Sequence, residues 1–364
     1  MKNFGNAVTR LINKNDFTYE EMYHFFRQIL QNIPSEMHQG AFLAALASKT
    51  ETITEARAVF DCIMKFDTNK VKINSLLPVI DNSGTGMDEI KTFNISSAAA
   101  IIASAEGAMI ARHGSRGITS SCGTIDIMES IGIGVEVPVD IVKKSIEEAG
   151  IGIFNGASPT VHPKALGRIL SKISFGSVLN IAASLANPTS PQVAVRGVYN
   201  PKMVLPVAEM MQEIGFKRAL VIHCYKNDGG QGIDEAGTIG ENIFAELKND
   251  SITTGKFSPE DFGIKRTTPE KIMSLKNIDL EKKRFIRVLS GCATRDEIDI
   301  VALNAGLIIY VADISDSIQN GIKIAYNSLS SKRPIEKLRQ WVKLQNFKGE
   351  TKVKEIDMFL SSVL

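Results

Sequence analysis

Apolar residues in the first 70 positions recur at the three- and four-residue spacing of amphipathic helices. One helical face carries Tyr19, Met22, Phe25, Phe26 and Leu30. Thr18 with Glu21 has the form of a capping box, Ser35 predicts the start of a second helix, and Thr54 predicts the start of a third. With no strand pattern between them, these segments predict a small all-helical domain over residues 1–70. Its apolar faces predict packing against other helices or a second subunit.

From position 76 onward, short apolar runs alternate with longer amphipathic stretches. The short runs predict buried strands at 76–80, 108–111, 151–154, 193–199 and 219–223. The longer stretches predict helices at 95–107, 125–131, 139–149, 164–173, 178–185, 201–214, 281–289, 295–311, 315–329 and 334–344. This alternation predicts an α/β domain in which helices flank a mostly parallel sheet.

Composition narrows the class of protein. A chain of 364 residues with 44% hydrophobic and 23% charged residues is typical of a globule with two domains. Its net charge of +2 gives no support for a nucleic acid or membrane partner. No apolar run approaches the roughly 20 residues that span a bilayer, and the N-terminus lacks a signal-peptide core, so we expect a cytoplasmic protein. The widely spaced cysteines predict neither a zinc site nor a disulfide framework; they are Cys62, Cys122, Cys224 and Cys292.

Candidate chemistry begins where the first predicted strand ends. Gly84-Thr85-Gly86 follows that strand, and glycines there let the backbone approach an anionic ligand closely, although such a sequence is also typical of a simple turn. Asn94 is a good N-cap for the next helix, whose free N–H groups and dipole would attract phosphate. Residues 112–121 then combine two arginines, a histidine and several hydroxyls on a glycine-bearing loop, which is an anion-binding composition.

A second chemical centre is the pair Asp234-Glu235, in a glycine-rich loop after the predicted strand at 219–223. Adjacent carboxylates at a strand end suit Mg²⁺, which takes hard oxygen ligands and keeps several waters. A solvated acidic turn is the alternative interpretation.

Four motifs together resemble those of the anthranilate phosphoribosyltransferase family: GTGMD, TFNISS, ARHGSRGITSSCGTID and GIDEAG. They occur in the family's order, and the likeness extends from about residue 35 to residue 344. The resemblance implies Mg²⁺-dependent transfer of 5-phosphoribosyl from phosphoribosyl pyrophosphate to anthranilate, or to a similar small aromatic or nitrogenous acceptor, with release of pyrophosphate. Tryptophan biosynthesis and a homodimer formed through the helical domain are implied as well.

The resemblance also implies a domain division and a set of site residues. Helices from about 163–186 would join the domain at 1–70, while 71–162 and 187–364 would form the α/β domain that binds phosphoribosyl pyrophosphate. His113, Asp234 and Glu235 would be catalytic, and Ser96, Asp234 and Glu235 would bind metal. Substrate would be bound by Gly84, Thr85, Gly86, Asp88, Thr92, Asn94, Ser96, Ser97, Arg112, Ser115, Ser120, Thr124, His162 and Lys172. Either histidine could contact the acceptor, assist proton removal, or merely pack in its loop.

Several positions depart from the family's pattern. Met87 stands where a second glycine is usual, Arg112 where lysine is usual, and Thr124 where serine is usual. Ser115 replaces the asparagine that binds anthranilate, and positions 170–172 lie nearest to the arginine that clamps the acceptor but contain none. A carboxylate acceptor would normally meet an arginine fork, so the acceptor remains open.

Two other functions remain possible. A pyrimidine-type nucleoside phosphorylase would also carry Ser115-Arg116-Gly117 and the 123–130 segment, but the retained Asn94-Ile95-Ser96 and Asp234-Glu235 favour pyrophosphate and metal. A non-catalytic relative that binds nucleic acid would have eroded phosphate motifs and a concentrated basic face. The motifs are intact and the net charge does not support such a face.

Overall fold

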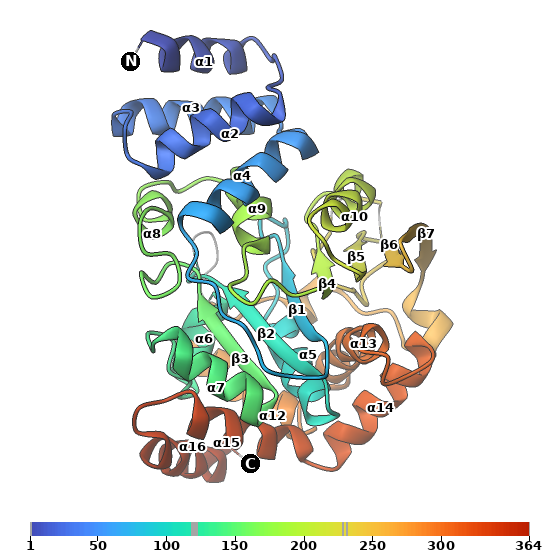
Figure 1. The fold of residues 1–364 in the computed structure, drawn as a ribbon. Coiled ribbons are helices and arrows are strands. Elements are labelled where there is room, and N and C mark those ends of the chain that lie inside the picture. The colour runs from blue at the N-terminus through green and yellow to red at the C-terminus, as the bar shows by residue number, and fades with distance from the viewer. Residues whose placement is uncertain (1, 118–122, 228, 231, 364) are drawn as a thin grey trace.

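The computed structural model describes residues 2–117, 123–227, 229–230 and 232–363. Its N-terminal part is a stack of four helices at the top of Figure 1: α1 (Lys2–Ile12), α2 (Tyr19–Leu30), α3 (Glu36–Lys49) and α4 (Ile53–Phe66). These four helices are called the helical layer below.

Capping explains where these helices begin. Thr18 and Glu21 form the predicted capping box of α2, and the Ser35 hydroxyl accepts from the His38 N–H at the start of α3. The prediction for α4 was two residues late, because Thr52, not Thr54, makes a reciprocal box with Glu55. Helix α1 was not predicted as a separate element. Its sequence is mostly polar, but it buries Phe4, Ala7 and Leu11.

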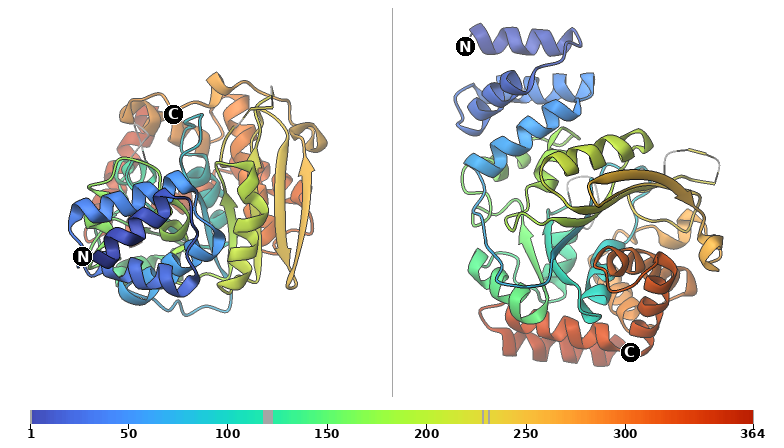
Figure 2. Two further views of the ribbon diagram at one scale, coloured as in Figure 1. Left: turned by 90° about the horizontal axis from the view of Figure 1, so that it is seen from above. Right: turned by 45° about the vertical axis from the view of Figure 1, so that its right-hand side comes forward.

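A seven-stranded sheet fills the middle of the molecule, in the order β3-β2-β1-β4-β5-β6-β7. Its first five strands are parallel, which confirms the predicted sheet: β1 (Val79–Gly84), β2 (Met109–Gly114), β3 (Ile151–Asn155), β4 (Val193–Gly197) and β5 (Arg218–Cys224). Strands β6 (Asn242–Lys248) and β7 (Ser251–Phe257) add an antiparallel hairpin at the outer edge, which the sequence analysis did not anticipate. Figure 2 shows this hairpin on the side away from β3.

Two strands have boundaries that differ from the predicted ones, and the difference changes where polar side chains lie. The first strand begins at Val79, not at residue 76, because Leu76 and Leu77 are exposed while the polar Asp81 and Asn82 are buried. The second strand continues to Gly114, so Arg112 and His113 lie on a buried strand and not on the predicted loop.

Helices flank the sheet as predicted. Helix α7 has the predicted bounds and α8 is much shorter than predicted. The helices after α4 are α5 (Ile95–Ala105), α6 (Thr124–Ser130), α7 (Val139–Ala149), α8 (Leu166–Leu170), α9 (Leu179–Leu185), η1 (Pro201–Met203), α10 (Val204–Glu213), η2 (Pro259–Phe262), α11 (Pro269–Ile272), α12 (Ile278–Leu289), α13 (Arg295–Val311), α14 (Ile318–Ser330), α15 (Arg333–Leu344) and α16 (Gly349–Val363). Helix α16 lies beyond the last helix predicted from the sequence, and it buries Ile356 and Leu360.

One large apolar core lies on each face of the sheet. Alternate strand residues such as Val195 and Leu220 pack with α5, α13 and α15 on one face. Ala194 and Val221 point to the other face and share a core with α9, α10 and the helical layer. The division into domains at residues 70, 163 and 186 stays a prediction, since this second core is continuous across it. No helix in the described ranges is both long and apolar enough to cross a membrane.

Candidate active site

A cavity of about 280 Å³ opens at the carboxyl ends of the parallel strands. Strand β1 lies between β2 and β4, so the direction in which successive strands are added reverses there. Open α/β sheets bind ligands at such a reversal. Gly84, Asn94, Arg112 and Asp234 all line the cavity, so the segments that were expected to converge do so.

Glycines let the acidic loop lie directly on the loop after β1. A Cβ added to Gly84 would be 2.2 Å from the Asp234 carboxylate, and one added to Gly197 would be 1.5 Å from the Asp234 carbonyl oxygen. The Gly86 N–H donates to Asp234 Oδ2 at 2.6 Å, from a backbone with φ of +69° that glycine tolerates. Close approach of the Asp234 carboxylate therefore requires glycine at position 84, and the positive φ favours glycine at position 86.

The start of α5 holds the second carboxylate. Ser96 donates to Glu235 Oε1 through both its N–H (3.0 Å) and its hydroxyl (2.7 Å), and the Thr92 hydroxyl donates to Oε2 at 3.0 Å. Asn94 occupies the N-cap position as predicted, but its side chain makes no capping hydrogen bond with described residues. In this structure the positive end of α5 therefore faces the carboxyl group of Glu235.

Three carboxylates share this low-dielectric site: Asp88, Asp234 and Glu235. Burial, and then the neighbouring charge of Asp234, raises the pKa of Glu235 to about 8 and that of Asp88 to about 7. Burial also raises the pKa of Asp234. Lys91 lies 3.1 Å from Asp88 and offsets only part of this negative charge. The site is therefore electrostatically prepared for a cation.

The donor set fits a hard divalent metal. Among the described residues, no three side chains of Asp, Glu, His or Cys are grouped closely enough to hold an ion by themselves. The neighbouring pair Asp234 and Glu235 offers carboxylate oxygens, and Ser96 adds a hydroxyl oxygen beside them. A metal held this way would complete its shell with water and ligand oxygens, as Mg²⁺ commonly does.

Arg112 is a buried cation beneath the start of α5. Its Nε donates to Asn82 Oδ1 at 3.1 Å and its Nη1 donates to the Ser97 hydroxyl. Burial lowers the pKa of Arg112 to about 10, so it remains protonated at neutral pH. The arginine fork can therefore bind an anion from the floor of the cavity.

A second buried arginine was missed by the sequence analysis. Arg196 on β4 pairs with Asp81 Oδ2 at 2.9 Å and donates to the Ser83 hydroxyl at 2.6 Å, which braces β1 just before the glycine loop. The signal was available in the sequence. Charged residues inside the apolar strand runs VIDNSG and VAVRG indicate a buried ion pair.

His113 and His162 form a buried pair with defined tautomers. His162 Nδ1 lies 2.5 Å from the Asp67 carbonyl oxygen and must donate to it, so neutral His162 carries its lone pair on Nε2. His113 Nε2 lies 3.1 Å from that atom and donates to it. His113 Nδ1 is buried, close to the backbone of Ser184. Burial, then the neighbouring His162, lowers the pKa of His113 to about 3.

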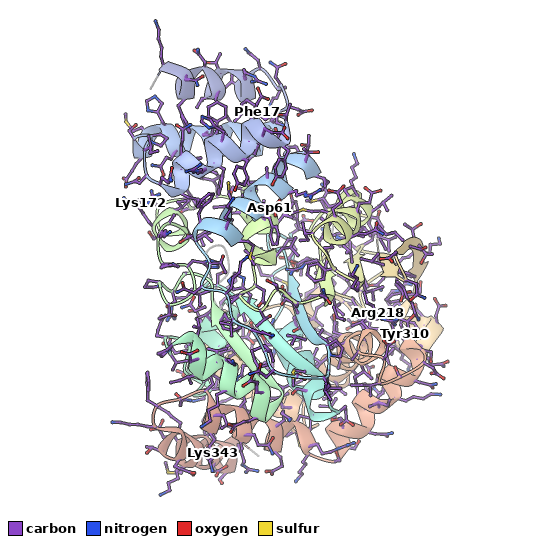
Figure 3. All side chains as sticks on the ribbon, viewed as in Figure 1. Phe17, Asp61, Lys172, Arg218, Tyr310 and Lys343 are labelled. Carbon is purple, nitrogen blue, oxygen red and sulfur yellow. The ribbon has the colours of Figure 1, made fainter. Side chains whose placement is uncertain are left out.

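The other predicted site residues divide into three groups. Most line the cavity: Thr85, Gly86, Asp88, Thr92, Ser96, Ser97, His113, Ser115, Thr124 and Glu235. His162 and Lys172 do not. His162 lies behind His113, and the half-exposed Lys172 pairs with Glu36 of α3 at the outer edge of the molecule (Figure 3). Ser120 lies outside the described residues.

Comparison with known proteins identifies the family. Residues 76–332 match the model of the glycosyl transferase family a/b domain, and residues 6–66 match that of its helical bundle domain. An anthranilate phosphoribosyltransferase of Methanothermobacter marburgensis is 32% identical over 90% of this chain and 95% of the relative. One of Methanosarcina acetivorans is 34% identical over 97% of this chain and 92% of the relative.

Solved structures agree with these relatives. The crystal structure of anthranilate phosphoribosyltransferase from Thermus thermophilus has a TM-score of 0.82 and 28% identity, and covers 93% of this chain and 99% of that chain. The enzyme from Saccharomyces cerevisiae in complex with PRPP and Mg shares the fold, with a TM-score of 0.79 and 18% identity over 97% and 98% of the two chains. These matches do not favour the nucleoside phosphorylase or nucleic-acid-binding alternatives. The chain belongs to the anthranilate phosphoribosyltransferase family of glycosyltransferases.

Proposed function

We propose that this protein is a Mg²⁺-dependent phosphoribosyltransferase. It moves 5-phosphoribosyl from phosphoribosyl pyrophosphate to anthranilate or a similar small aromatic or nitrogenous acceptor and releases pyrophosphate. The main support is the convergence of the glycine loop, the start of α5, Arg112 and Asp234-Glu235 around one cavity. This chain covers more than nine-tenths of the length of relatives named anthranilate phosphoribosyltransferase, which supports the same activity.

The reaction requires charge stabilisation more than covalent chemistry. Arg112 binds and orients the anionic donor beside the Gly84–Gly86 loop, and Ser96 and Ser97 add hydroxyls at the start of α5. Asp234, Glu235 and Ser96 would hold Mg²⁺, which would supply positive charge to neutralise the diphosphate. The ring of His113 also lines the cavity and is uncharged at neutral pH, because burial lowers its pKa to about 3.

The test is a double variant, Asp234→Asn with Glu235→Gln, assayed by pyrophosphate release from phosphoribosyl pyrophosphate with Mg²⁺ and candidate acceptors. We expect turnover to fall by at least about 100-fold, as when one preorganised electrostatic group is removed. Circular dichroism should show an unchanged fold. Glu350→Gln with Glu355→Gln removes the same charge from the exposed face of α16 and should keep full activity. Unchanged turnover in the first variant would remove the metal assignment.

We also propose a cytoplasmic homodimer. A role in tryptophan biosynthesis would follow only if anthranilate is the acceptor. The helical layer leaves Ile12, Ile33 and Met37 exposed at 62%, 63% and 82%, which supports a subunit contact there. Sedimentation should give a dimer that Met37→Glu weakens, and a wild-type monomer would contradict it. Cell fractionation tests the location.

A further inference from the structure

The cavity has two chemically different walls. The wall around β1, β2 and the start of α5 is polar and charged. The second wall comes from residues 163–186, which run beneath the helical layer. Most of its side chains are apolar, and the polar ones carry no charge. The apolar residues are Leu166, Leu170, Ile173, Phe175, Leu179 and Ala183, and the polar ones are Ser177, Asn180 and Ser184.

The basic side chains of this segment turn away from the cavity. Arg168 donates to Gln39 Oε1 at 2.9 Å and to the Ile29 carbonyl oxygen at 3.0 Å, and Lys172 pairs with Glu36, so both are held by the helical layer. Lys164, the third basic residue of the segment, is exposed and does not line the cavity. Within the described residues, the second wall therefore offers no cation.

The cations that do line the cavity belong to the polar wall. Lys91 pairs with Asp88, and Arg112 is bound to the strand and helix beneath the donor site. Arg116 pairs with Glu129 at 2.7 Å. Each is held by a partner on the polar wall, so none of the three belongs to the second wall.

Met87 extends the apolar character of the second wall. It has φ of +71°, a left-handed conformation that costs a non-glycine residue free energy. A Cβ added to Gly176 would lie 1.9 Å from Met87 Cε, so the thioether packs directly on that glycine. The Asn180 side chain donates to the Thr85 carbonyl oxygen at 3.1 Å and ties the same two segments together. The left-handed backbone of Met87 thus places an apolar side chain between the Gly84–Gly86 loop and the second wall.

We infer that the acceptor is an uncharged small aromatic amine, held by the second wall, and that Met87 and Leu170 select against a carboxylate. This inference rests on the proposed function. A carboxylate against this wall would lose its hydration without gaining a cation, whereas an uncharged ring would gain apolar contact. The amine nitrogen forms a bond to C1 of phosphoribosyl pyrophosphate. The C1–O bond breaks with its electron pair leaving on pyrophosphate, and a pyrophosphate oxygen takes the amine proton.

The test compares anthranilate with 2-aminobenzamide, which has the same ring and amine but an uncharged amide. Pyrophosphate release with phosphoribosyl pyrophosphate and Mg²⁺ should give a kcat/KM at least about tenfold higher for the amide. Leu170→Arg supplies a cation on the second wall and should shift this ratio toward anthranilate by about tenfold or more. Leu205→Arg, at an exposed position on α10, is the matched control and should leave the ratio unchanged.

Failure of the inference can be separated from failure of the function. Phosphoribosyl pyrophosphate with Mg²⁺ should raise the melting temperature without any acceptor, because it binds the native state. If that shift occurs and anthranilate is used as well as the amide or better, the inference is overturned while the function stands. A shift with no turnover of either acceptor also overturns it. If there is neither a shift nor turnover, the proposed function itself fails. The comparison of the two acceptors uses the wild-type protein, so its outcome does not depend on whether a variant folds.

Discussion

Ion pairs in this protein differ widely in how deeply they are buried. Arg196 is fully buried and its carboxylate partner is Asp81, whereas the ion pair between Arg57 and Glu213 at 2.5 Å is partly exposed. Water can replace a lost partner at the exposed pair but not at the buried one. Removal of the carboxylate should therefore lower the free energy of unfolding much more at the buried pair than at the exposed pair.

We predict that Asp81→Asn lowers the free energy of unfolding by about 3–5 kcal/mol, because it leaves a buried guanidinium without its counter-charge. Glu213→Gln should lower it by no more than about 1 kcal/mol. Urea denaturation of both variants measures the difference. Similar values for the two variants would show that the Asp81 site is reached by water.

A second residue-scale prediction concerns pH. Burial lowers the pKa of His113 to about 3, below its ordinary value of 6.5. Between these two pKa values, the imidazole is protonated in the unfolded chain but not in the folded chain. The contribution of neutral His113 to the free energy of unfolding is therefore fully present above pH 6.5 and is lost as pH falls toward 3. His113→Gln keeps a donor toward His162 but cannot titrate. As pH is lowered from about 6 to about 4, the free energy of unfolding of this variant should fall less steeply than that of the wild type. The two slopes should differ by about 1.4 kcal/mol per pH unit. Parallel slopes would contradict the buried neutral pair.

At the scale of elements, capping groups decide where helices begin. Glu55 is buried and its carboxylate accepts from the N–H of Thr52 at 2.8 Å and from that of Phe17 at 2.9 Å, which joins α4 to the loop before α2. Lys49 pairs with the same carboxylate at 2.8 Å. The start of α4 is thus part of the packing of the helical layer.

Two neighbouring threonines test this assignment. Thr52→Ala removes the hydroxyl that accepts from the Glu55 N–H and should lower the free energy of unfolding by about 1 kcal/mol. Thr54→Ala, at an exposed position inside the helix, should change it by less than about 0.5 kcal/mol. Chemical denaturation of the two variants is the measurement. The reverse order would place the cap at Thr54.

At the scale of the whole molecule, the sheet couples the two cores. Strands β4 and β5 contribute alternate side chains to the core under the helical layer and to the core on the opposite face. The single tryptophan, Trp341, is fully buried in α15, at the end of the molecule opposite the helical layer (Figure 1). Its fluorescence therefore reports on the distant core, whereas circular dichroism also reports on the four helices.

We predict that both signals change at the same denaturant concentration, because the helical layer has no core independent of the sheet. The experiment is one urea titration followed by both probes. A loss of helical signal at lower urea, with Trp341 fluorescence still native, would show that the helical layer unfolds by itself.

Sequence alone determined the elements whose signals are local. Caps and apolar periodicity located α2, α3 and α7, and apolar runs located five parallel strands to within a few residues, because neighbouring residues set those preferences. The glycine loop and the Asp234-Glu235 pair were also visible, since both motifs are short and contiguous. The resemblance of these motifs to one family then identified the class of enzyme.

Tertiary structure alone decided what depends on partners distant in the chain. Strand β1 continues through Asp81 because Arg196 lies beside it on β4, and Lys172 turns outward because Glu36 of α3 attracts it. Met87 faces Gly176, which leaves the acceptor side of the cavity apolar. The sequence contains each of these residues, but it does not fix where their side chains point or which charges surround them. Those features follow from contacts that exist only when segments separated by about 90 to 140 positions pack together.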